Sequence, residues 1–65
     1  MTVSSIIKLT NYNTHVIILN AVGAILFDGR SIDLYERDEL MRRAVDIVGV
    51  SESILIIQTS KEKVK

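Results

Sequence analysis

The side chains best suited to chemistry lie just before the most apolar stretch of the chain. Tyr12, Asn13 and His15 follow Asn11 and offer hydroxyl, amide and imidazole groups. Such a group could hold a small polar ligand or the backbone of a partner. Turn chemistry is the simpler explanation, because Asn tolerates the left-handed backbone and bonds its own main chain. Tyr12, Asn13 and His15 are therefore a candidate polar ligand contact, and an ordinary loop is the favoured interpretation.

Catalysis and metal binding have weaker support. A catalytic His15 would need a nucleophile or a carboxylate within hydrogen-bond reach, and no spacing in the sequence supplies one. A structural zinc takes four ligands from Cys, His and carboxylates, whereas this chain has one histidine and no cysteine. The glycines are scattered singly, so no phosphate-binding loop is formed. We expect no catalytic residue, no metal ligand and no cofactor.

The basic residues could instead contact nucleic acid. Lys plus Arg equals Asp plus Glu at 8 each, so no overall field draws the chain to nucleic acid or to an anionic membrane. Arg42 and Arg43 each have an acid four positions earlier, which is typical of a solvated helix face. A nucleic-acid-binding small β domain that uses Lys8, Arg30 and the C-terminal lysines is the alternative function. A small-ligand-binding module at a subunit interface is a further alternative.

Chain length favours association. A chain of 65 residues forms one domain, which we place at residues 1–60, followed by a charged tail at 61–65. So short a chain is marginally stable unless disulfides, a metal or oligomerisation help. Without cysteine or a zinc site, oligomerisation is the expected source of stability. The apolar run over residues 16–27 is too short to span a membrane, and we expect a cytoplasmic protein.

The hydrophobic pattern predicts the element order β-β-β-β-α-β. Residues 3–10 alternate roughly between apolar and polar, as in a half-buried strand. Residues 14–19 and 53–59 are apolar on both faces, as in central strands. Asp28 and Gly29 separate two strand-like runs and predict a two-residue hairpin turn between residues 24–27 and 30–35.

Residues 36–48 are predicted to form the helix. Their apolar residues fall on a single stripe, and Gly49 follows where a left-handed helix cap belongs. An alternative start at Asp33, with Glu36 three positions later as a capping box, would shorten the preceding strand. The expected fold class is therefore α+β: a small, mostly antiparallel sheet with one helix packed on one face. Partial closure of the sheet into a barrel is an alternative.

The apolar strand surface exceeds what that helix can cover. A helix of about 13 residues spans only about 20 Å and covers one face of a sheet, whereas two strands are apolar on both faces. The second face requires closure of the sheet, another copy of the chain or a partner. The predicted interface consists of Val16, Ile18, Leu26, Ile54 and Ile56. No polar marker in these strands decides which face is the interface.

The predicted function follows from this surplus. We expect a non-enzymatic interaction protein that is homo-oligomeric, with a dimer as the expected state. It would act by binding another protein, in an accessory or inhibitory role. This role is inferred by analogy with other small domains and not from a motif in the sequence.

Overall fold

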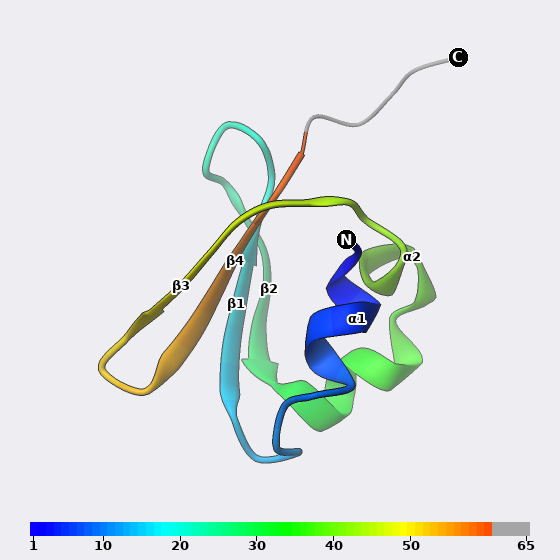
Figure 1. The fold of residues 1–65 in the computed structure, drawn as a ribbon, viewed down its shortest axis with the longest axis vertical. Coiled ribbons are helices and arrows are strands. Elements are labelled where there is room, and N and C mark those ends of the chain that lie inside the picture. The colour runs from blue at the N-terminus through cyan, green and yellow to red at the C-terminus, as the bar shows by residue number, and fades with distance from the viewer. Residues whose placement is uncertain (61–65) are drawn as a thin grey trace.

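In the computed structural model, which describes residues 1–60, four strands form one sheet and three short helices lie against one of its faces (Figure 1). The elements are α1 (Val3–Ile7), β1 (His15–Leu19), β2 (Ile25–Arg30), the 3-10 helix η1 (Ser31–Glu36), α2 (Asp38–Met41), β3 (Val45–Ser51) and β4 (Ile54–Thr59). The strand order is β2-β1-β4-β3, with a parallel central pair and antiparallel outer pairs. The predicted α+β class is confirmed, and the sheet is open, with β2 and β3 at its edges.

The two segments predicted to be central strands occupy the centre of the sheet. β1 and β4 run in parallel, with Val16 opposite Leu55 and Ile18 opposite Ile57. Because side chains alternate along a strand, only one set can face the helices. Val16 and Ile18 are fully buried on that side, and the intervening Ile17 is half-buried on the other.

The core fills the space between the sheet and the helices. Its members are Val16, Ile18, Phe27 and Ile57 from the strands and Val3, Ile7, Leu34, Leu40 and Met41 from the helices. The Arg37 guanidinium lies 5.9 Å from the centre of the Phe27 ring, at the border of this core. No helix within residues 1–60 is long and apolar enough to cross a membrane.

The strand predicted over residues 3–10 is wrong, because this segment begins with helix α1. The Thr2 hydroxyl accepts a hydrogen bond from the Ser5 amide at 3.4 Å and caps the helix. Val3 and Ile7, four positions apart, lie on the same helix face and are both fully buried. Short helical spacing and approximate alternation are hard to tell apart in a segment this brief.

The hairpin predicted at Asp28 and Gly29 is not formed, because both residues lie inside β2 and pair with β1. A Cβ on Gly29 would lie 3.1 Å from Cζ of Phe27, so the glycine accommodates a packed ring and makes no turn. The predicted second strand over residues 30–35 is also wrong. The 3-10 helix begins there with the fully buried Ser31, whose hydroxyl donates to the carbonyl of Asn11.

The helix predicted over residues 36–48 is formed only at Asp38–Met41. Glu36 is the last residue of η1, and β3 begins at Val45. The N-terminal residues hold this part of the chain extended. The Val3 amide donates to the Arg43 carbonyl at 3.0 Å, and the Val45 amide donates to the Met1 carbonyl at 2.9 Å. Gly49, predicted as a helix cap, therefore lies within a strand.

The two-residue turn of the structure joins β3 to β4. Glu52 and Ser53 both have positive φ, at 51° and 66°, as a type I′ hairpin requires. Neither residue is glycine or asparagine, so turn chemistry did not single them out in the sequence. In Figure 1 the tip of this hairpin lies far from the helices.

A matched pair of variants tests which β-sheet side chains form the core. Ile18→Val removes one methylene from a fully buried site and should lower the free energy of unfolding by about 1 kcal/mol. Ile25→Val makes the same change at a side chain that is 62% exposed in the single chain and should cost clearly less. Urea denaturation of both variants measures the difference, and equal losses would contradict the assigned sides of the sheet.

A second pair tests the turn. Ser53→Gly relieves a left-handed backbone that costs an L-residue about 1–2 kcal/mol, against about 0.5–1 kcal/mol for the extra freedom of glycine. Stability should therefore rise by up to about 1.5 kcal/mol. The control Ser51→Gly, in the extended strand two positions earlier, should lower stability in the same urea assay. A loss of stability in both variants would be inconsistent with a positive φ at Ser53.

Candidate interaction surface

The face of the sheet turned away from the helices carries apolar side chains from all four strands. Strand alternation and the observed register place six residues there: Ile17 and Leu19 of β1, Ile25 of β2, Ile47 of β3, and Ile54 and Ile56 of β4. We call these six residues the open face. Ile25 and Ile47 are 62% and 58% exposed, and the other four are half-buried. No helix within residues 1–60 lies on this side of the sheet (Figure 1).

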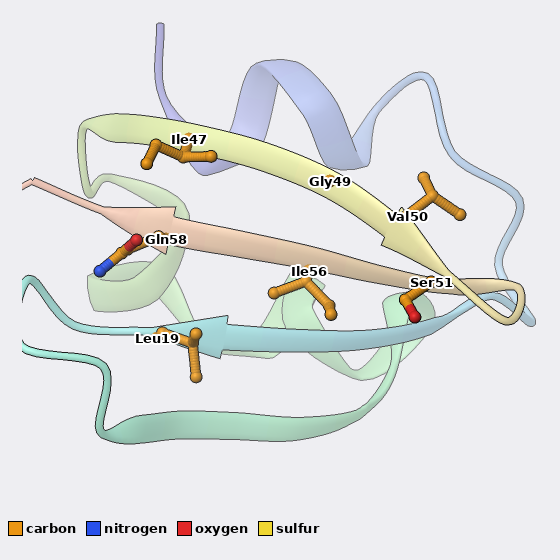
Figure 2. A pocket seen from close by; sticks show the side chains of 7 residues that line it. All are labelled: Leu19, Ile47, Gly49, Val50, Ser51, Ile56 and Gln58. Carbon is orange, nitrogen blue, oxygen red and sulfur yellow. The ribbon is translucent and has the colours of Figure 1, made fainter.

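A shallow depression of about 230 Å³ marks one part of the open face. Figure 2 shows the residues that line it, which are Leu19, Ile47, Gly49, Val50, Ser51, Ile56 and Gln58. A Cβ added to Gly49 would meet no atom within 4 Å, so the missing side chain contributes to the hollow. Its volume is below the roughly 300 Å³ at which small-molecule pockets begin. The depression is better suited to a side chain from another protein chain.

A polar group lies at the end of the open face nearest the start of β1. The His15 Nε2 and Asp28 Oδ1 atoms are 2.5 Å apart, and their side chains are 41% and 52% exposed. The Arg30 guanidinium donates to the Asn13 carbonyl at 2.7 Å. Asp28 and Arg30 bring one negative and one positive charge to this end. Among the described residues, no three His, Cys, Asp or Glu side chains gather as metal ligands.

The three residues predicted as a polar ligand contact do not converge on one site. His15 pairs with Asp28 on the open face, whereas the ring of Tyr12 meets Tyr35 edge-on, with 5.9 Å between ring centres. Asn13 takes part through its backbone carbonyl. Tyr12 and Tyr35 also line a second depression, of about 180 Å³, with Lys8, Thr10 and Asn11.

The basic residues of the nucleic-acid alternative lie in different surroundings. Lys8 lines the depression beside the two tyrosines, and Arg30 lies at the polar end of the open face. The C-terminal lysines fall within residues 61–65, outside the part of the chain that the structure describes.

The residues predicted as the interface are divided between the two sides of the sheet. Ile54 and Ile56 lie on the open face, whereas Val16 and Ile18 are fully buried in the core. Leu26 is the extra residue of a bulge in β2 and packs against the core. Within one chain, these last three residues therefore belong to the core or pack against it and do not lie on the open face.

The open face also contains four residues that the sequence analysis did not assign to an interface: Ile17, Leu19, Ile25 and Ile47. On β1 the open-face residues are Ile17 and Leu19, which alternate with Val16 and Ile18. Two polar residues in the sequence indicate which side of these strands faces away from the core. His15 lies on the same side of β1 as Ile17, and Gln58 lies on the same side of β4 as Ile56. Ile25 and Ile47 were missed because their segments were predicted to be part of a different hairpin and of a helix.

Comparison with protein-family models, with curated proteins and with solved structures finds no match. The functional inference therefore depends on the residues of this chain.

Proposed function

We propose that this chain is a non-enzymatic interaction protein that associates with a second copy of itself through the open face. The observation that carries the proposal is an apolar surface built from all four strands without a cover among residues 1–60. Strands of five to seven residues, at about 3.3 Å per residue and about 4.8 Å between strands, give this face an outline of about 400 Å². The apolar residues of the open face lie within this outline, and the largest apolar patch of a monomer, typically a few hundred Å², is often functional.

A second copy suits this face for two reasons. The formal net charge is +0, and the Asp28 and Arg30 charges at its polar end offset one another, so two copies do not repel. Two apolar sheet faces can also pack about 10 Å apart with interdigitating side chains. A two-fold axis would bury the same residues in both copies. The dimer is therefore the unit that covers the open face.

The tyrosine pair supports the binding of another protein by the dimer. Tyr12 and Tyr35 are 61% and 41% exposed, and the neighbouring Ile32 is 44% exposed. Tyrosine is enriched in protein interfaces because its ring offers a large apolar surface and its hydroxyl a polar contact. Tyr35 and Ile32 belong to η1, on the helix side of the sheet, so this surface remains accessible when the open face is covered.

Charged substitutions on the open face test the proposal. Ile25→Lys places a charge at an exposed position of β2, where the fold should tolerate it, and burial of that charge in an interface would be costly. The mass measured by light scattering after size exclusion should fall by half. The control Val22→Lys changes a loop residue that is 88% exposed and should leave the mass unchanged.

Circular dichroism confirms that each variant is folded. The double variant Ile17→Lys, Ile25→Lys extends the test to the centre of the open face. A folded protein whose mass stays the same in the Ile25→Lys variant and in the folded double variant would refute association through this face.

A further inference from the structure

The outer edge of β3 is only partly paired. At its start, Thr2 forms an antiparallel bridge with Ala44, and the Val45 amide donates to the Met1 carbonyl at 2.9 Å. From Ile47 to Ser51, β3 pairs with β4 on one side, and no segment within residues 1–60 pairs with it on the other. The N-terminal residues therefore show that this edge accepts an antiparallel strand, and they leave most of its length free.

The backbone groups along this free edge alternate in direction. In a two-residue hairpin the residues that flank the turn, here Ser51 and Ile54, form a hydrogen-bonded pair. Such pairs alternate along antiparallel strands, so Gly49 also directs its amide and carbonyl to β4. Val48 and Val50, between these positions, direct theirs outward. A partner strand could bond to both residues without breaking a bond inside the sheet.

The free edge lacks the features that usually block strand addition. Natural edge strands carry lysines, prolines, charges or bulges that discourage pairing. The β2 edge has such features, with Asp28, Arg30 and a bulge at Leu26. On β3 such features, the charge of Asp46 and a bulge between Val45 and Ile47, lie at the start of the strand, and none occurs from Ile47 to Ser51. Two apolar side chains of this edge are also exposed: Val48 is 43% exposed and Val50 is 72% exposed.

We propose that this edge pairs with the β3 edge of a second copy, antiparallel, about a two-fold axis at Val48. The contact is distinct from the open face and goes beyond the self-association proposed above. Antiparallel pairing about a two-fold axis joins two four-stranded sheets into one continuous sheet of eight strands. Each copy uses the same residues, as an isologous interface requires.

The residues of β3 are self-complementary in this register. With Val48 opposite its own copy, Ile47 lies opposite Gly49, and Asp46 lies opposite Val50. Ser51 then reaches Val45, so Met1, whose carbonyl accepts the Val45 amide, must move aside when the two copies pair. The Ile47 side chain then covers the bare backbone at Gly49, where a Cβ would meet no atom within 4 Å. No like charges face each other across the pair. A register that sets Gly49 opposite Gly49 would leave the hollow empty in both copies.

Interface area also favours this second contact. The open face offers an outline of about 400 Å² per copy, about half of the roughly 800 Å² per partner that stable complexes bury. Pairing at β3 adds backbone hydrogen bonds and buries Val48 and Val50. Two dimers joined at their β3 edges form a closed assembly of four copies if the two-fold axes of the two contacts intersect at right angles.

Two edge variants test the proposal. Val48→Pro removes an outward amide, which an edge strand tolerates. Val50→Glu places a second acid opposite Asp46 of the other copy, on an exposed edge position. Each should halve the wild-type mass of four copies in light scattering, with the circular dichroism spectrum unchanged. Addition of Ile25→Lys to either variant should give single chains. Val22→Lys is again the control.

The outcomes separate the two contacts. If folded Val48→Pro and Val50→Glu variants keep the wild-type mass while Ile25→Lys lowers it, the edge proposal is refuted and association through the open face stands. If the edge variants lower the mass and Ile25→Lys does not, the β3 contact stands and the open-face proposal fails. A wild-type protein that is a single chain at all concentrations would refute both.

Disulfide trapping tests the register, since the chain has no cysteine of its own. Ile47→Cys and Gly49→Cys proteins, mixed and oxidised, should form the mixed disulfide in preference to either homodisulfide. A preference for the Gly49→Cys homodisulfide would overturn the proposed register, and so would the absence of any crosslink.

Discussion

The parallel pairing of β1 with β4 at the centre of the sheet is the constraint on which the rest of the structure depends. It aligns Val16 and Ile18 with Leu55 and Ile57 and turns them toward the helices. Since side chains alternate along each strand, burial of this set turns the next set, which includes Ile17, to the opposite side. One register therefore determines both the core and the open face, and a shift by one residue would exchange them.

The helices can serve only one of these two sides. They are short, and each is fixed against the same face by a few buried residues, such as Ile7 of α1, Leu34 of η1 and Leu40 of α2. The strands are apolar enough for two covered faces, yet the described chain supplies one layer of helices. This imbalance is the basis of the proposed dimer. The free edge of β3 offers a second contact, through which two dimers can join.

The sequence predicted the features that follow from apolar content. The two central strands and the excess of apolar strand surface are both visible in apolar runs such as residues 54–57. The α+β class was also predicted, although from a helix that is formed only at Asp38–Met41. Features set by tertiary contacts were not predictable. Asp28-Gly29 is typical of a turn, but Gly29 lies in a strand and accommodates the Phe27 ring. The segment that forms β3 has helical periodicity, but hydrogen bonds with the N-terminal residues hold it extended. The real turn uses Glu52 and Ser53, whose residue types do not indicate positive φ.

Sedimentation equilibrium of the wild-type protein over a wide dilution series tests the central claim most directly. A single chain has a mass of 7.3 kDa. If the apolar strand surface is an interface between copies, the mass at high concentration should be a whole multiple of that value and should fall toward it only on strong dilution. A mass of 7.3 kDa throughout the series, for a folded protein, would contradict the account.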